Sequence, residues 1–175
     1  MPKTLNYRSK ISRASRGVTL MELLVAMLIL SVLGSIALPK LNDMKASFDR
    51  RDAKQKLEFD LRRARAEALS KGVRVVITLS SDLQSYTVGE DLLAYDTTNG
   101  NHDTLLFTTV LPQNVTLSFS GSGPDQTKLI FTSRGFLSDI IGNRNTSQRT
   151  ITLSYQGSSF STATIYPVGV ASFGS

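Results

Sequence analysis

One apolar stretch near the start of the chain limits what the rest can fold into. Between Val18 and Leu38 there are 21 residues and a single charged side chain, Glu22. At about 1.5 Å per residue, a helix of this length spans the roughly 30 Å hydrocarbon core of a membrane. A charged side chain costs about 2.5–3.5 kcal/mol at the centre of such a helix and less near its end, where Glu22 lies. The stretch is therefore a candidate membrane helix, and its acidic residue is a candidate functional residue.

The residues before this stretch are strongly basic. Residues 1–17 contain no acidic residue and five positive charges: Lys3, Arg8, Lys10, Arg13 and Arg16. A basic flank beside an apolar span stays in the cytoplasm. We therefore expect a cytoplasmic N-terminus and export of the bulk of the chain.

The residues alone leave two simple interpretations of the apolar stretch. An ordinary secretory signal peptide fits the basic flank and a small-x-small cleavage site at Ser35-Ile36-Ala37. Its product would be a soluble periplasmic binding domain, but the apolar run exceeds the usual length of about 7–15 residues and contains an acid. A plain membrane anchor explains the length but leaves Glu22 unexplained.

A third interpretation comes from the residues around Gly17. Gly17 is followed by a hydrophobic residue, Val18, and by Glu22 as the fifth residue after the glycine. With the basic leader and Pro39, this pattern resembles the signal of type IV prepilins. It departs from that signal at Val18, because phenylalanine is the commoner residue at this position. The resemblance implies that a prepilin peptidase cleaves after Gly17 and methylates the amine of Val18. It also implies that Glu22 pairs with the N-terminal amine of a neighbouring subunit and that Pro39 kinks the helix.

The helix is expected to continue beyond the membrane. Helix-forming residues run from Leu41 to Leu69 without Gly or Pro, and Lys71-Gly72 is typical of a helix C-terminus. Apolar residues recur at spacings that place them on one helix face, and we expect a sheet to pack on the later ones. This stripe consists of Leu41, Met44, Phe48, Ala53, Leu57, Leu61, Ala64 and Ala68.

The opposite helix face is charged. Arg62-Arg63-Ala64-Arg65 could contact phosphate, but acidic residues alternate with the basic ones, as in the i,i+4 pair Glu58–Arg62. A solvated face is the simpler interpretation, and it includes Asp49, Asp52, Glu58, Asp60 and Glu67. Without residues 1–17, 15 Lys and Arg oppose 14 Asp and Glu, a formal charge of about +1. Global charge therefore gives no support for a polyanionic partner.

After Gly72 the apolar pattern changes to strand-like alternation. Strands are expected at Val73–Leu79, Leu83–Val88, Leu105–Val110, Val115–Ser120, Lys128–Thr132, Thr150–Tyr155 and Ser161–Tyr166. Turns such as Ser80-Ser81-Asp82 separate them, and Gly89–Asp103 is the most loop-like stretch. The sequence therefore predicts an α+β protein with one long N-terminal helix laid across antiparallel sheet. The expected division is a cleaved leader (1–17), a transmembrane helix (18–39), an amphipathic continuation (40–72) and a β-rich periplasmic domain (73–175).

No catalytic or metal-binding motif stands out. Cysteine is absent, and the single histidine, His102, lies in a loop. We therefore expect neither an enzyme nor a bound cofactor or metal. Acidic residues of one loop region could supply oxygen ligands to calcium, but they lack EF-hand spacing, and a polar loop is the simpler interpretation. These residues are Asp82, Glu90, Asp91, Asp96 and Asp103.

The residues at the end of the helix narrow the resemblance to one class of pilin-like proteins. Arg65, Glu67 and Ala68 match the "ARxEA" helix end of the GspH/FimT class of minor pseudopilins and minor pilins. Phe131–Gly135, Ile151–Leu153 and a last strand toward Pro167-Val168-Gly169 resemble this class by spacing more than by identity.

The resemblance implies a role in filament assembly at the inner membrane. The favoured function is a minor pseudopilin of type II secretion, and the alternative is a minor type IV pilin that primes pilus assembly or takes up DNA. DNA-binding members of the class carry arginines near the C-terminus, whereas Tyr155–Ser175 has no Lys or Arg. Nucleic acid is therefore disfavoured as a partner, although Arg134, Arg144 and Arg149 lie in expected loops. The implied partners are the prepilin peptidase, other pilin-like subunits and the inner-membrane assembly platform.

Overall fold

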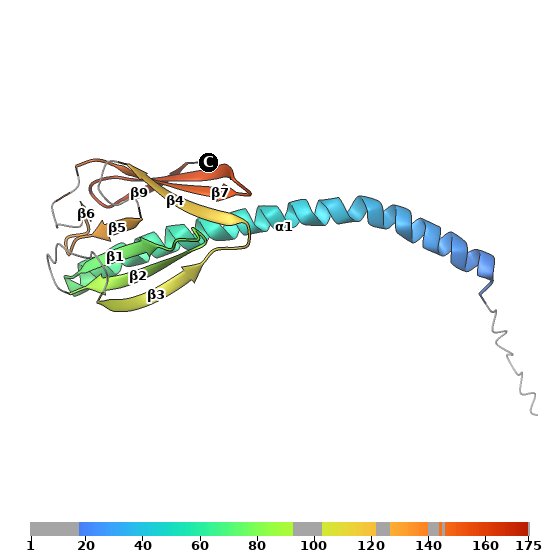
Figure 1. Ribbon diagram of the computed structural model, residues 1–175, viewed down its shortest axis with the longest axis horizontal. Helices are drawn as coiled ribbons and strands as arrows, with labels where there is room; N and C mark the ends of the chain where they lie inside the picture. The colour runs from blue at the N-terminus through green and yellow to red at the C-terminus, as the bar shows by residue number, and fades with distance from the viewer. Residues whose placement is uncertain (1–17, 93–102, 122–126, 140–143, 145, 175) are drawn as a thin grey trace, which may run out of the picture. The chain divides into compact units, whose positions relative to one another are not determined.

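The computed structural model describes residues 18–92, 103–121, 127–139, 144 and 146–174. The chain divides into two compact units, Met1–Asp43 and Met44–Ser175. One helix, α1 (Leu20–Lys71), has residues in both units, and every strand belongs to the second unit (Figure 1). The expected α+β fold with a long N-terminal helix is confirmed.

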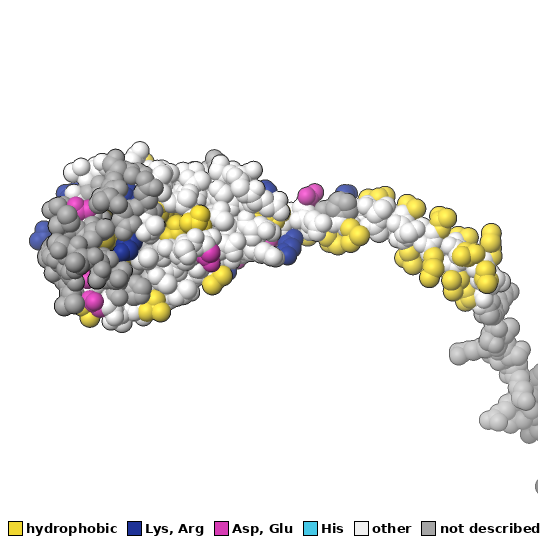
Figure 2. Space-filling view, viewed as in Figure 1, with side chains coloured by type: hydrophobic (Ala, Val, Ile, Leu, Met, Phe, Trp, Pro, Cys, Tyr) yellow, Lys and Arg dark blue, Asp and Glu magenta, His cyan; other side chains and the backbone are white. Residues whose placement is uncertain are grey.

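In the first unit, α1 exposes its apolar side chains along its whole length. Large hydrophobic residues from Leu20 to Leu38 are exposed, and hydrophobic side chains gather along this part of the helix in Figure 2. By length and composition this part of α1 can cross a membrane, a test that a signal sequence would also pass. Such a surface is stable in hydrocarbon rather than in water.

The C-terminus of α1 lies where the sequence predicts it. Gly72 has a φ of +67°, which glycine adopts without the steric cost of a Cβ atom. Its N–H donates a hydrogen bond of 3.1 Å to the carbonyl of Ala68. This left-handed residue ends the helix, and the first strand begins two residues later at Arg74.

The described strands form two antiparallel sheets. The first has the order β3-β2-β1-β5-β6 and the second the order β4-β7-β8-β9. The first sheet contains β1 (Arg74–Leu79), β2 (Ser85–Asp91), β3 (Thr104–Val110), β5 (Lys128–Phe131) and β6 (Leu137–Ser138). The second contains β4 (Val115–Gly121), β7 (Arg149–Tyr155), β8 (Ser158–Ile165) and β9 (Ala171–Gly174).

All seven expected strands are present, and two more were not predicted. The short β6 and β9 lack a long apolar alternation, so only their pairing with β5 and β8 makes them strands. The expected last strand toward Pro167-Val168-Gly169 ends at Ile165, and residues 166–170 form the turn into β9. The expected loop from Gly89 was wrong at its start, because β2 continues to Asp91.

One core joins α1 to both sheets. Leu57 is 1% exposed, and the other helical members of the core are also buried: Ala53, Leu61, Ala64 and Ala68. Burial of a leucine side chain contributes about 1.5–3 kcal/mol, while the alanines let the helix approach the strands closely. The expected packing of a sheet on the later part of the stripe is confirmed. Met44 and Phe48, which lie earlier on the same stripe, are 55% and 62% exposed. The described core reaches only as far as Ala53.

Candidate functional site

Thr19, the residue before α1, is the N-cap of this helix. The Thr19 Oγ1 accepts a 3.2 Å hydrogen bond from the backbone N–H of Glu22. A threonine three residues before a glutamate is the capping-box sequence, and the positive end of the helix dipole favours a carboxylate in this first turn. Glu22 is exposed, and no ion pair involves it within the residues described. Its side chain is therefore exposed in the first turn of the helix.

The remaining residues of the expected processing site are only partly described. Gly17 lies outside the described residues, whereas Val18 is exposed just before the helix. Pro39 lies within the bounds of α1, but its side chain is outside the described set. Cleavage after Gly17, methylation of Val18, pairing of Glu22 and a kink at Pro39 therefore stay predictions.

Arg65 joins α1 to two distant loops of the second unit. Its Nε–H donates to the carbonyl of Gly135 at 3.2 Å, and its Nη2 donates to the carbonyl of Val168 at 3.1 Å. The two loops touch here, because a Cβ atom on Gly169 would lie 1.9 Å from the oxygen of Gly135. Gly135 and Gly169 also have φ angles of +73° and +77°, which favour glycine. Arg65, which belongs to the "ARxEA" segment, therefore holds these two loops against α1.

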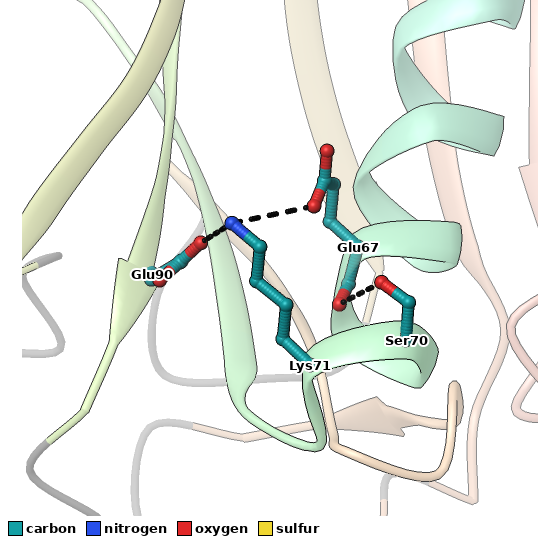
Figure 3. A network of polar contacts seen from close by, with 4 residues as sticks. All are labelled: Glu67, Ser70, Lys71 and Glu90. Carbon is teal, nitrogen blue, oxygen red and sulfur yellow. Dashed lines mark hydrogen bonds and ion pairs between the residues drawn. The ribbon is translucent and has the colours of Figure 1, made fainter.

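The other charged residue of that segment belongs to a polar network at the helix end (Figure 3). Lys71 lies between two carboxylates, with its Nζ 3.5 Å from Glu67 Oε2 and in contact with Glu90 Oε1. The hydrogen bond to Glu90 is the main reason that the pKa of Lys71 is raised above its ordinary value. Ser70 Oγ donates to the carbonyl of Glu67 at 3.2 Å. The network ties the last turn of α1 to β2.

The acidic residues considered for calcium have other roles. Asp91 pairs with Arg74, and both side chains are buried, at 5% and 8% exposure. Asp82 caps the turn between β1 and β2, where it accepts a 2.9 Å hydrogen bond from the N–H of Gln84. The hydroxyl of Ser80 lowers the pKa of Asp82, and Glu90 contacts Lys71.

Asp103, the last described member of this group, accepts a 2.7 Å hydrogen bond from the N–H of Leu92. Asp96 and His102 lie outside the described residues. Within the described part, no group of three His, Cys, Asp or Glu side chains could hold a metal ion.

Asp60 is a buried polar residue, so the prediction that it lies on the solvated face of the helix was wrong. It is 7% exposed and accepts hydrogen bonds from Tyr86 Oη at 2.8 Å and from Thr109 Oγ1 at 2.6 Å. Burial, followed by the hydrogen bond to Asp60, raises the pKa of Tyr86. The interaction anchors α1 to β2 and β3. The only sequence signal was the position of Asp60 next to Leu61, at the boundary of the apolar stripe.

A groove of about 380 Å³ lies between α1 and the start of β9. Phe131 contributes to its lining but is itself almost fully buried, while Leu69 and Val170 are exposed. The lining contains no acid, histidine, serine or threonine, so it offers no nucleophile and no general base. Its residues are Leu61, Arg62, Arg65, Ala66, Leu69, Phe131, Gly169, Val170 and Ala171.

Two family models match separate parts of the sequence. Residues 53–169 match the family described as type II transport protein GspH, and residues 12–38 match the prokaryotic N-terminal methylation motif. No curated protein sequence matches the chain.

Solved structures show similar folds. The type IV minor pilin FimU of Pseudomonas aeruginosa is 20% identical, with a TM-score of 0.56, over 71% of this chain and 87% of that one. A second crystal form of FimU gives a TM-score of 0.55 at 20% identity, over 71% and 92% of the two chains. The minor pseudopilin EpsH of the Vibrio cholerae type 2 secretion system is 15% identical, with a TM-score of 0.49, over 70% and 94%.

Proposed function

Because the chain belongs to the GspH family of type II transport proteins, we propose that it is a minor pseudopilin of a type II secretion system. It assembles through its N-terminal helix into a periplasmic filament that drives protein export. The carrying observation is that an N-terminal methylation motif at residues 12–38 precedes the GspH match at residues 53–169. The role is structural rather than enzymatic, as is usual for pilin-like proteins.

Processing creates the mature N-terminus. A prepilin peptidase removes the leader, residues 1–17, by cutting after Gly17, and the new amine on Val18 is methylated. The exposed position of Val18 just before the helix supports this proposal, since the new N-terminal residue then lies outside the helix. The motif match that covers this segment supports it as well.

Assembly uses the exposed carboxylate of Glu22. In the apolar environment of residues 18–39, a lone carboxylate is costly, and an ammonium group beside it offsets much of that cost. The N-terminal amine of a neighbouring subunit supplies this ammonium and fixes the register between helices. A kink at Pro39 would adjust the helix to its neighbours.

The proposed topology follows the charge distribution. Residues 1–17 are cytoplasmic, 18–39 cross the inner membrane, and 40–72 continue as an amphipathic helix into the periplasmic domain, 73–175. Five basic residues before the span support this orientation. Other pseudopilins and the inner-membrane assembly platform are the proposed partners.

The test is the intact mass of membrane-extracted protein, produced with and without a prepilin peptidase. We expect loss of residues 1–17 and gain of one methyl group only when the peptidase is present. A Gly17→Val variant is the matched control and should keep its leader. A cut after Ala37, or the same mass in both strains, would refute the filament function in favour of a secreted or simply anchored domain.

A minor type IV pilin is the second candidate, and the likeness of the fold to the minor pilin FimU favours it. Deletion of the gene separates the two functions. Loss of secreted protein with normal pili supports the pseudopilin, whereas loss of pili with normal secretion supports the pilin. Loss of DNA uptake alone would support the DNA-binding variant of the pilin function.

A further inference from the structure

Among the described strands, β9 is the edge of its sheet and has one open side. Within the described residues it pairs only with β8. The N–H of Tyr166 donates to the carbonyl of Val170 at 2.9 Å, which makes these two residues a hydrogen-bonded pair. Such pairs alternate along an antiparallel ladder, so Ser172 and Gly174 direct their N–H and C=O groups toward β8. Ala171 and Phe173 direct theirs toward the open side.

The groove described above reaches β9 at Ala171, the first residue of the strand and one that directs its backbone groups toward the open side. Val170, in the turn before β9, also lines the groove, and Ala66 and Leu69 contribute the helix side. At about 380 Å³, the volume falls within the range of about 300–1,000 Å³ typical of ligand sites. An extended peptide beside β9 would pair with its backbone and place alternate side chains in the groove, as in β-strand addition.

The groove is lined by two arginines, one of which is paired with an acidic residue beside the groove. Arg62 and Arg65 are the only charged residues in the lining. Arg65 is held by two backbone carbonyls, but the Arg62 side chain is 76% exposed, with its Nη2 2.5 Å from Glu58. The remaining N–H groups of this guanidinium can bind a carboxylate. The groove therefore complements an apolar segment that carries an acidic side chain.

We propose that this groove, the β9 groove, binds an extended apolar segment with one carboxylate from another pilin-like subunit of the same filament. The segment adds to β9 as a strand, inserts apolar side chains beside Phe131 and Leu69, and places its carboxylate at Arg62. The inference rests on the proposed function, because a filament holds this domain beside other subunits at high effective concentration.

The test is site-specific photo-crosslinking in cells that assemble the complete filament. p-Benzoylphenylalanine replaces Val170 at the groove or, as a control, the exposed Thr108 on β3. We expect the Val170 probe to crosslink to a segment of another pilin-like subunit that contains apolar and acidic residues, located by mass spectrometry of the crosslinked peptide. The Thr108 probe should not label that segment. Crosslinks to a second copy of this chain, to an exported protein, or to nothing overturn the proposal.

Two pairs of variants then test the chemistry. Ala66→Arg fills the groove from an exposed helix position, and we expect at least a tenfold loss of the crosslink, with Gln55→Arg on α1 as the control. Arg62→Glu should give a similar loss, restored when the acidic residue of the partner is changed to lysine, with Arg51→Glu as the control. Unchanged thermal unfolding shows that the domain is folded. Full crosslinking in Ala66→Arg or Arg62→Glu overturns the proposal.

Failure of this inference and failure of the proposed function give different results. A chain that keeps its leader in the presence of the peptidase refutes the filament function itself. A chain that is processed and incorporated, but whose Val170 probe finds no other subunit, refutes only the β9 groove.

Discussion

The two halves of α1 share one backbone geometry and opposite surroundings. From Leu20 to Leu38 the large side chains are exposed and almost uniformly apolar, whereas from Ala53 to Ala68 one narrow stripe is buried under two sheets. The first half needs an apolar solvent or other helices to cover it, while the second half already has its partners within its own chain. One α-helix therefore has a first half that its own domain does not cover and a second half that packs in the core of that domain.

Leu57→Ala should give the largest change in stability and sharpen this contrast. Removing a leucine side chain from a packed core lowers the free energy of unfolding by about 2–5 kcal/mol, and Leu57 is almost fully buried. Leu28→Ala, the matched change in the first half, should leave the unfolding of the domain unchanged. Chemical denaturation in detergent measures both, and equal effects would contradict the division of the helix.

Asp60→Ala should give the next largest effect. The change leaves the hydroxyl groups of Tyr86 and Thr109 without their acceptor, and an unsatisfied buried group costs about 1–3 kcal/mol. Thermal and denaturant unfolding measure the loss. Asp52→Ala is the control, because Asp52 is exposed and forms an i,i+4 pair with Lys56. A loss equal to that of Asp52→Ala would show that the Asp60 contacts add no stability.

Thr19→Ala should have a smaller effect, confined to the first half. Loss of an N-cap hydrogen bond costs about 0.5–2 kcal/mol of helix stability, and Thr19 caps the turn that contains Glu22. Amide hydrogen exchange in detergent should rise at Leu20–Leu23 and stay constant at Ala64–Ala68. Thr19→Ser, which keeps the hydroxyl, should exchange like the wild type. A change at both ends of α1 would argue against independent halves.

Lys71→Met should give the smallest effect, and one that depends on pH. Because the folded-state pKa of Lys71 is raised, mainly by Glu90, its stabilisation is complete below the ordinary value of about 10.5. It disappears as the pH rises through the higher folded-state value. The difference in thermal unfolding between Lys71→Met and wild type should therefore shrink above pH 10.5, with exposed Lys45→Met as the control. A difference that stays constant with pH would exclude the charged contact as its cause.

The sequence alone determined the features that depend on neighbours within a few residues. Four features could be predicted because local dihedral preferences and side-chain periodicity fix them. They are the apolar span, the glycine that ends α1, the helical stripe from Ala53, and all the described strands except β6 and β9. The i,i+4 pair Glu58–Arg62 could be predicted for the same reason.

Only the tertiary structure decided which surfaces are covered and which distant groups meet. Arg65 binds carbonyls 70 and 103 residues away in the chain, and Asp60 is buried because β2 and β3 bring their hydroxyl groups to it. Met44 and Phe48 fit the same stripe as Leu57 but lie exposed. Periodicity predicts the helix face on which a side chain lies. Which strands pack on that face depends on pairing between residues far apart in the sequence. That pairing also made β6 and β9 strands and formed the groove beside β9.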